Sequence, residues 1–365
     1  MKHEEEIVKN IKSGFIDGLI VTIVGLIGFG IVKKCIDHYK RKNYGKTKTL
    51  LSSLGFKNVI PTLNDYELSI ASQLIDPSAI DVTFADIAGL DNIIESIKTE
   101  IILPLLTYPI MRQKFRHFQP PKGVLLHGPP GCGKTMIAKA TAKEAGARFI
   151  NLAIPTLTDK WYGESQKYAL AVFTLAQKLQ PCIIFVDEID TFLRSRRITD
   201  HEVTAMMKAQ FMILWDGLNS KKDECGVVVL GATNRPHDVD EAILRRMPSR
   251  FEIPKPDRRQ RQQILNLLLA GESLQDDVDV EKLAESTNGF SASDLKELCR
   301  SALSAPICQR ASEILELASA TDKTKLSRFL ADLRNVNHGD FQAVLARIDE
   351  RSDLKGHDHS CSRSE

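Results

Sequence analysis

The segment that most constrains the fold is a glycine-rich run, Gly-Pro-Pro-Gly-Cys-Gly-Lys-Thr at 128–135. The apolar run 123–127 before it predicts a short buried strand, and the stretch 136–147 after it is rich in helix-forming residues. Glycines allow backbone angles that point successive N–H groups at one anion, and a helix N-terminus adds partial positive charge. The pattern therefore predicts a phosphate-binding loop in an α/β fold. Its residues are Gly128, Pro129, Pro130, Gly131, Cys132, Gly133, Lys134 and Thr135. A Gly/Pro turn that matches by chance is the alternative.

A second segment supplies the acidic groups that such a loop requires. The apolar run 182–186 predicts a parallel strand covered on both faces, and it ends in Asp187 and Glu188. We expect Lys134 to contact the β- and γ-phosphates of a nucleoside triphosphate, and Thr135 and Asp187 to hold its Mg²⁺. Glu188 is then the base that orients and deprotonates the attacking water. Two surface acids at a strand end are the alternative.

Length and composition limit the number of domains and the classes of partner that the sequence allows. The chain has 365 residues, of which 43% are hydrophobic and 26% charged, which is enough for about two globular domains. The formal net charge of +2 gives no overall bias toward nucleic acid, and we expect none as a partner. The seven cysteines contain no C-x-x-C pair, which favours reduced thiols in a cytosolic environment over disulfides or a zinc site.

The N-terminal region predicts a membrane anchor at residues 13–32. The run 18–32 has no charged residue, and extending it to Ser13 includes only Asp17. Twenty helical residues span about 30 Å, the thickness of a bilayer core, so we expect one transmembrane helix with Asp17 near an interface. A cleaved signal peptide is the alternative, but no small-residue cleavage motif follows.

Flanking charge predicts the orientation of this helix. Seven basic residues follow it between 33 and 48, whereas lysines and glutamates are mixed in the segment 1–12. The more basic side stays in the cytosol, so the body of the protein is expected to face the cytosol. The same basic run could also contact nucleic acid, which is the weaker interpretation beside an apolar span.

The remaining chain predicts a basic linker at 33–80 with some helical pattern, then two domains. A helix is expected at 91–103. Strands at 123–127, 148–153, 182–187, 227–232 and near 250–253 alternate with helical patterns and predict a parallel sheet sandwiched by helices at 81–256. Residues 257–349 predict a small helical domain, with helices at 258–269, 280–286, 293–309 and 341–348. A polar tail at 350–365 is expected to be disordered.

Further motifs resemble the AAA family of ATPases over residues 80–350. They are the two phosphate-site segments, Gly-Ala-Thr-Asn-Arg-Pro at 231–236 and Asn-Gly-Phe-Ser-Ala-Ser-Asp-Leu at 288–295. The resemblance implies ATP with Mg²⁺ as the ligand and makes Asn234 the sensor of the γ-phosphate that helps to place the water. An asparagine that caps the turn before Pro236 is the alternative.

Two other segments gain an interpretation from this resemblance. Leu-Arg-Arg-Met-Pro-Ser-Arg-Phe at 244–251 resembles the segment of arginine fingers, with Arg245 and Arg246 as the best matches and Arg250 as a third candidate. Fingers reach the nucleotide of a neighbouring subunit, so a homo-hexamer is implied; surface ion pairing is the alternative. Lys-Trp-Tyr-Gly-Glu-Ser at 160–165 resembles a first pore loop, with Trp161 and Tyr162 gripping a client unless they form a core pair.

The segment 194–202 resembles a second pore loop with His201 as its contact residue, and it lacks the second histidine of an H-E-x-x-H protease motif.

Together with the anchor, these features resemble the thorase branch of membrane-anchored extractases. That resemblance implies removal of mislocalised tail-anchored proteins from the mitochondrial outer membrane, with the peroxisomal membrane as a second implied location. A filament-severing or coat-disassembling ATPase of the katanin and spastin branch, and a tethered nucleotide switch without turnover, are the competing hypotheses.

Overall fold

The computed structural model describes residues 45–111, 114–115, 118–155, 164–193, 202–218, 226–319, 329 and 332–358. The membrane helix predicted at 13–32 lies outside these ranges. Within them, no helix combines the length and apolar character needed to cross a bilayer. The chain divides into two compact units, Met1–Leu74 and Ile75–Glu365.

The described part of the first unit contains folded structure inside the predicted linker. Helix α2 (Asp65–Ala71) follows a short 3-10 turn, η1 (Ile60–Thr62). It begins with a capping box in which the Asn64 side chain accepts from the Glu67 N–H and the Glu67 carboxylate accepts from the Asn64 N–H. Its apolar residues Leu68 and Ile70 are buried.

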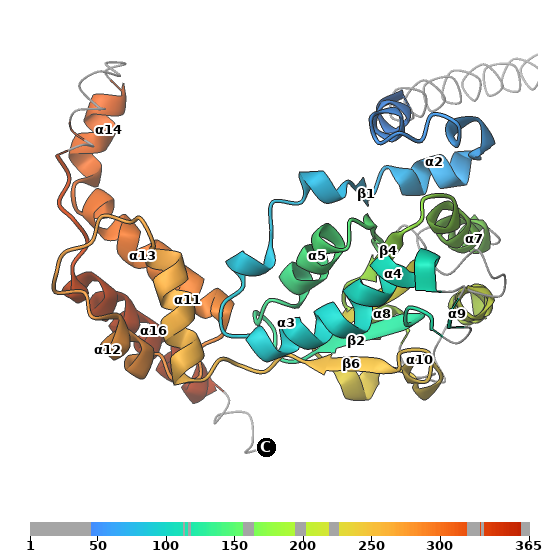
Figure 1. Cartoon of the computed structure of the whole chain (residues 1–365). Helices are drawn as coiled ribbons and strands as arrows, with labels where there is room; N and C mark the ends of the chain where they lie inside the picture. The colour runs from blue at the N-terminus through green and yellow to red at the C-terminus, as the bar shows by residue number, and fades with distance from the viewer. Residues whose placement is uncertain are drawn as a thin grey trace, which may run out of the picture. The chain divides into compact units, whose positions relative to one another are not determined.

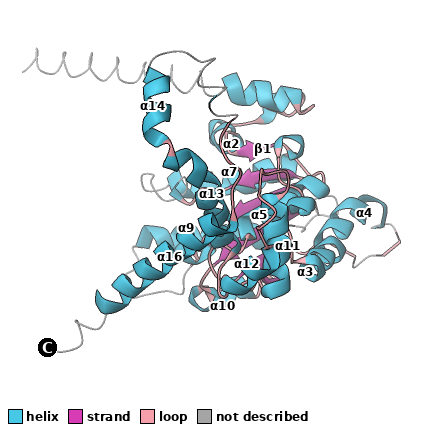
Figure 2. Ribbon diagram, turned by 90° about the vertical axis from the view of Figure 1, so that its left-hand side faces the viewer, coloured by secondary structure: helices cyan, strands magenta, loops and turns pink. Residues whose placement is uncertain are grey.

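A six-stranded sheet forms the centre of the second unit and has the order β1-β3-β4-β5-β2-β6. The predicted strands are confirmed within a few residues. They are β2 (Gly123–His127), β3 (Arg148–Asn151), β4 (Cys182–Val186), β5 (Val227–Thr233) and β6 (Ser249–Glu252), to which the structure adds β1 (Leu74–Ile75). The β3–β4, β4–β5, β5–β2 and β2–β6 pairs are parallel, as predicted. In Figure 2 the strands lie among surrounding helices.

Helices that follow from the apolar patterns cover one face of the sheet. α3 (Asp91–Ile97), a π-turn (Lys98–Ile102), α4 (Leu103–Met111) and α5 (Lys134–Glu144) pack on alternate residues of the central strands. The predicted helix 91–103 therefore continues to Met111. Pro104 has no N–H to donate, and the ladder widens just before it, where the Leu103 N–H reaches the Lys98 carbonyl.

The remaining helices of the sheet domain are α7 (Glu164–Lys178), α8 (Ile189–Phe192), α9 (Glu202–Gly217) and the short α10 (Glu241–Leu244). α7 contacts β4 and α9, and α8 contacts β5. Phe211 of α9 joins these helices because its ring meets Phe173 of α7 at 4.9 Å and Phe192 of α8 at 5.4 Å, both edge to face.

The C-terminal helices form a separate cluster with its own apolar core (Figure 1). They are α11 (Arg258–Leu269), α12 (Val280–Ser286), α13 (Ala292–Gln309), α14 (Ala311–Ser319) and α16 (His338–Asp358). α14 was not predicted. α16 corrects the prediction of a disordered tail from 350, because the helix runs on to Asp358. Polar composition does not prevent a helix with one face packed on α13.

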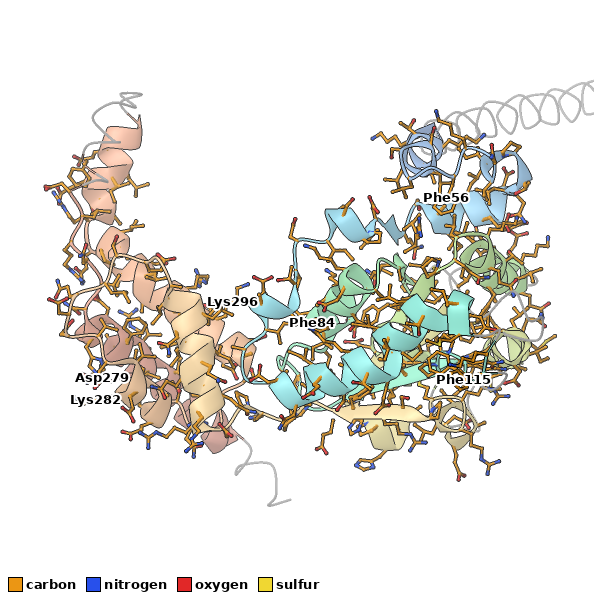
Figure 3. The ribbon with its side chains drawn as sticks, viewed as in Figure 1. Phe56, Phe84, Phe115, Asp279, Lys282 and Lys296 are labelled. Carbon is orange, nitrogen blue, oxygen red and sulfur yellow. The ribbon has the colours of Figure 1, made fainter. Side chains whose placement is uncertain are left out.

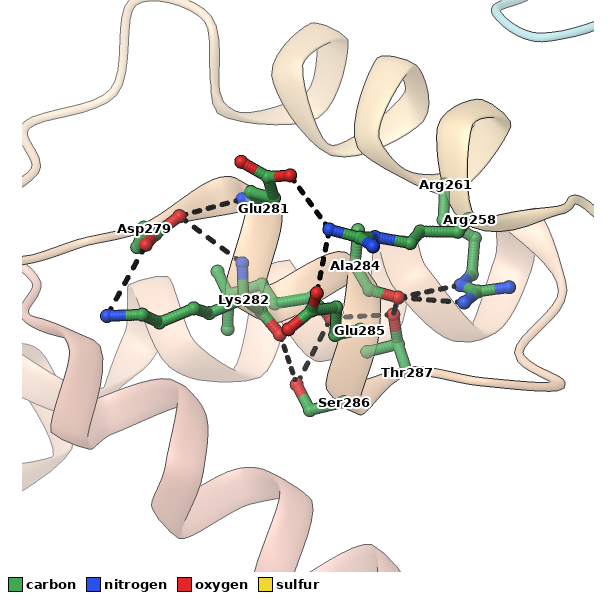
Figure 4. Close-up of polar contacts among 10 residues, drawn as sticks. Arg258, Arg261, Asp279, Glu281, Lys282, Ala284, Glu285, Ser286 and Thr287 are labelled. Atoms are coloured by element: carbon green, nitrogen blue, oxygen red, sulfur yellow. Dashed lines mark hydrogen bonds and ion pairs between the residues drawn. The ribbon is translucent and has the colours of Figure 1, made fainter.

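A polar network fixes the start of this helical domain (Figure 4). Asp279 caps α12 by accepting from the N–H groups of Glu281 and Lys282. The Arg261 guanidinium is buried and donates to the carbonyls of Ala284 and Pro256. α11 and α12 are thereby held together by backbone carbonyls as well as by apolar contacts.

Candidate nucleotide site

The phosphate loop lies between β2 and α5, as the sequence predicts, and its backbone requires glycine. Gly128, Gly131 and Gly133 have φ angles of +146°, +75° and +94°. A Cβ atom on Gly128 would lie 2.1 Å from the Ile253 carbonyl oxygen, which no side chain can tolerate. The loop therefore combines left-handed geometry with close backbone packing, and both exclude larger residues.

Lys134 is the first residue of α5, and its side chain is directed back at the loop. The residue is only 7% exposed, and its Nζ donates to the carbonyls of Gly128 at 2.9 Å and Pro129 at 2.7 Å. Burial lowers the pKa of this ammonium from its ordinary value. Neighbouring Cys132 is also buried, and burial raises the pKa of its thiol. The loop thus holds a lysine ammonium against its own carbonyls.

The acidic pair lies at the carboxyl end of β4, beside the loop. The Thr135 hydroxyl donates to Asp187 Oδ2 at 2.9 Å, and Asp187 Oδ1 accepts from the Glu188 N–H at 3.0 Å. Glu188 has φ of +49°, the left-handed region, and is the only non-glycine residue with positive φ in the described ranges. Such a conformation costs about 1–3 kcal/mol and is concentrated at functional sites. The turn therefore presents an exposed Glu188 side chain next to Asp187.

Asn234 follows the last residue of β5 and is exposed. Because β4 and β5 are parallel, with Val186 opposite Gly231, both strands end at the same edge of the sheet. The structure thus brings the predicted loop, the acidic pair and Asn234 to one edge, where open α/β sheets bind ligands.

The side chains at this edge fit a magnesium-bound nucleotide. The Thr135 hydroxyl and the Asp187 carboxylate are hard oxygen donors already within hydrogen-bond distance of each other. No group of three or more His, Cys, Asp or Glu residues that could hold a metal occurs in the described part of the chain. Mg²⁺ matches that set, because it uses one or two protein oxygens and completes its shell with water and phosphate.

A cavity that the sequence did not predict adjoins the loop. Its lining comes from the segment 86–90, the loop residues Gly131–Gly133 with Met136, and the helical domain, including Ile264, Leu268 and Lys296. Apolar side chains with a few polar groups are typical of small-molecule sites. Lys296 (Figure 3) lies on α13, so the helical domain supplies part of this cavity.

Hydrogen bonds tie the helical domain to both other walls of the cavity. The Ser293 N–H donates to the Gly131 carbonyl at 3.0 Å, and the Gln260 side chain donates through Nε2 to the Gly89 carbonyl at 2.5 Å. The phosphate loop is therefore bonded directly to α13, and the segment 86–90 to α11. The only sequence signals for this cavity were the onset of packed composition near Val82 and the motif at 288–295.

The three arginine candidates differ in their surroundings. Arg246 makes a bidentate ion pair with Asp216 and also donates to the Ala242 carbonyl. Arg250 donates to the carbonyls of Met247 and Leu244. The Arg245 side chain is 79% exposed, and among the described residues its one ion pair is with Glu241, at 4.0 Å. Trp161, Tyr162 and His201 of the two predicted pore loops lie outside the described residues; of these segments the structure describes Glu164 and Ser165, which begin α7, and Glu202, which begins α9.

Replacing Lys134 with alanine is expected to abolish most ATP affinity. The substitution removes the ammonium group that the phosphate loop holds. Titration with a fluorescent ATP analogue measures the change, with Lys143→Ala, in the last turn of the same helix, as the charge-matched control. Unchanged affinity in Lys134→Ala would rule out the loop as the phosphate site.

Comparisons with known proteins agree with this geometry. Residues 124–255 match the ATPase family associated with various cellular activities (AAA), and residues 277–322 match the AAA+ lid domain. The outer mitochondrial transmembrane helix translocase of Rattus norvegicus is 48% identical over 95% of this chain and 99% of its own length. The Xenopus tropicalis protein of that name is 53% identical over 85% and 87%.

Solved structures show the same fold. The crystal structure of the FIGL-1 AAA domain in complex with ADP has a TM-score of 0.62 and 33% identity, covering 81% of this chain and 96% of that one. The matched segments contain the phosphate loop, the acidic pair and α13, which lines part of the cavity. With near-complete coverage by relatives of about half identity, the chain belongs to the AAA family of ATPases.

Proposed function

We propose that this protein is a membrane-anchored, ATP-driven translocase that extracts mislocalised tail-anchored proteins from the mitochondrial outer membrane. One observation carries the proposal: relatives named outer mitochondrial transmembrane helix translocase align with nearly the whole chain, from end to end. The apolar segment 13–32 supports a bilayer anchor with the ATPase domain in the cytosol. Peroxisomal membranes are a second proposed location.

The chemistry follows from the groups at the sheet edge. Lys134 and the loop N–H groups hold the phosphates of ATP, and Thr135 with Asp187 holds Mg²⁺, which neutralises phosphate charge when bound. Glu188 takes a proton from the attacking water, and Asn234 orients that water. The left-handed turn leaves the Glu188 side chain exposed, one residue after Asp187.

An oligomer completes the site. Arg245 is exposed and lacks a close ion pair, so it is available to a neighbouring subunit's nucleotide, whereas Arg246 is engaged within its own chain. We propose a homo-hexamer in which Arg245 acts as the principal finger, with Trp161, Tyr162 and His201 in loops that grip the client in a central pore.

The competing functions have weaker support. Likeness to the FIGL-1 AAA domain, at 33% identity, supports the fold and does not carry an activity. A nucleotide switch without turnover has no need for a left-handed Glu188 beside the proposed magnesium ligands or for a highly exposed arginine. Both features favour hydrolysis.

The pore-loop assignment has a direct test. Replacing both Trp161 and Tyr162 with alanine is expected to leave ATP turnover within about twofold and to abolish most client extraction, since each buried aromatic contributes about 1.5–3 kcal/mol of apolar contact. Extraction of a tail-anchored model client from liposomes is measured in parallel with ATPase rate. Exchanging the two aromatics for each other is the control and should be mild. Normal extraction by the double alanine variant would exclude threading and favour the switch.

A further inference from the structure

Thr233, the last residue of β5, contacts each of the three segments that form the proposed hydrolysis site. It is 1% exposed and lies opposite His127, the last residue of β2. Its position, one residue before Asn234, makes its contacts relevant to where the Asn234 side chain lies.

The first contact is to the phosphate loop. The Gly128 N–H donates to the Thr233 carbonyl at 3.3 Å, and this bond depends only on the backbone. It extends the β2–β5 pairing by one step into the loop. Any residue at position 233 can accept this backbone bond, so the bond does not explain why the residue there is a threonine.

The other two contacts use the hydroxyl. Thr233 Oγ1 donates to Asp190 Oδ1 at 2.6 Å and accepts from the Arg235 N–H at 2.9 Å. The second bond closes a turn around Asn234, which fixes the direction in which residue 234 leaves the strand. The first bond crosses to α8, two residues after Glu188.

Asp190 lies in the first turn of α8, which Glu188 caps in its left-handed conformation. The Glu188 carbonyl also accepts from Thr191 Oγ1 at 2.8 Å, so the turn is held from its own side as well. The Thr233–Asp190 bond is therefore a side-chain link between the turn that carries the base and the turn that carries the γ-phosphate sensor.

We propose that Thr233 and Asp190 form a positioning pair that holds Asn234 in register with Glu188 during ATP hydrolysis. Neither residue belongs to the phosphate loop or to the Thr135–Asp187 pair. Their bond sets the separation of two groups that must act on one water, and misplacement by about 1 Å can cost about 10²-fold in rate. The inference rests on the proposed function, since it assigns the pair a part in the same hydrolysis.

The test compares Thr233→Val with Thr233→Ser in the full-length chain. Valine matches threonine in shape and removes both hydroxyl bonds, so we expect kcat to fall about 10- to 100-fold while KM for ATP changes less than about threefold. Serine keeps the hydroxyl and should restore kcat to within about threefold of wild type. Thr287→Val is the matched control, because Thr287 is equally buried and its hydroxyl bonds to the Leu283 carbonyl within α12.

A second pair of variants covers the case in which Thr233→Val does not fold. Asp190→Asn keeps an oxygen acceptor for the Thr233 hydroxyl, whereas Asp190→Ala removes it, so only the alanine variant should lose kcat. Combining Asp190→Ala with Thr233→Val should cost no more than the larger single loss, because both remove the same bond. Fully additive losses would overturn the pairing.

Amide hydrogen exchange gives a readout independent of turnover. In Thr233→Val the Arg235 amide should exchange faster, while the Gly128 amide, bonded to a backbone carbonyl, should not. A raised KM at unchanged kcat, or an equal kcat loss in Thr287→Val, would overturn the proposal. The wild-type ATPase rate tests the proposed function separately: no turnover would refute both, whereas normal turnover with an unaffected Thr233→Val would refute only the positioning role.

Discussion

Replacing Glu188 with glutamine is expected to lower ATP turnover by about 10²–10⁴-fold, the contribution of a general base, while ATP still binds. The amide keeps the size of the side chain and can still contact the water, but it cannot take its proton. Residues that hold the phosphates, Lys134 and the loop glycines, are unchanged. The variant should therefore remain bound to ATP, and the oligomer should stay closed around its clients.

Two measurements on the purified full-length protein check this expectation, namely phosphate release and ATP affinity. Glu144→Gln is the control, because Glu144 is the last residue of α5, at the end opposite the phosphate loop, and pairs with Lys98. Asp187→Asn separates the two acids: losing a magnesium ligand should weaken Mg·ATP binding itself. Turnover of Glu188→Gln within about threefold of wild type would contradict the assignment of the base.

Much of this site could be predicted because its parts are local in sequence. The strand, the loop and the helix at 123–147 are contiguous, so glycine spacing alone indicates the phosphate cradle. The acidic pair ends a continuous apolar strand, and parallel strands place such ends at one edge. These relations depend on backbone geometry, which short motifs specify well.

The parts that were missed depend on contacts between distant segments. The cavity beside the loop combines residues 86–90 with side chains from α11 and α13. The hydrophobic periodicity of a sequence does not indicate which distant segments come together in this way. The Thr233–Asp190 bond likewise joins two segments through one hydroxyl. The sequence could not distinguish Arg245 from Arg246 either, because the difference arises from Asp216, on α9.

Helix ends were also difficult to predict. The helix predicted at 91–103 was too short, because the π-turn at 98–102 accommodates Pro104 and α4 continues to Met111. The polar segment after 350 suggested disorder, yet α16 extends to Asp358. In the first case a local rearrangement of hydrogen bonds outweighed a residue preference, and in the second a helix packed through Phe341 near its start continues into a polar sequence.

Replacing Arg245 with alanine is expected to cut ATP turnover by about 10³-fold or more, the effect of removing an arginine finger, with little change in ATP binding. The Arg245 side chain is 79% exposed, and its ion pair with Glu241 is long, at 4.0 Å. Losing this side chain should therefore not unfold the chain. Arg246→Ala should behave differently. It breaks a bidentate pair with Asp216, a contact between α9 and the segment after α10, and should lower the melting temperature as well as activity.

Mixing variants tests whether the arginine acts between subunits. Neither Arg245→Ala nor Glu188→Gln should hydrolyse ATP alone. In mixed oligomers, a site that has Glu188 from one variant and Arg245 from the other is intact, so part of the activity should return. Arg259→Ala, which removes an exposed arginine of α11, is the control and should stay near wild type.

The mixing result also decides between a role in trans and a role in cis. If Arg245 stabilised its own chain's site, no combination of the two inactive variants would restore turnover, and Arg245→Ala would weaken ATP binding in the isolated subunit. If adjacent subunits share each site, the recovered ATPase activity should rise with the product of the fractions of Arg245→Ala and Glu188→Gln chains in the mixture. Absence of recovery in oligomers shown to be mixed would therefore remove Arg245 as a finger and, with it, the structural reason for a closed ring.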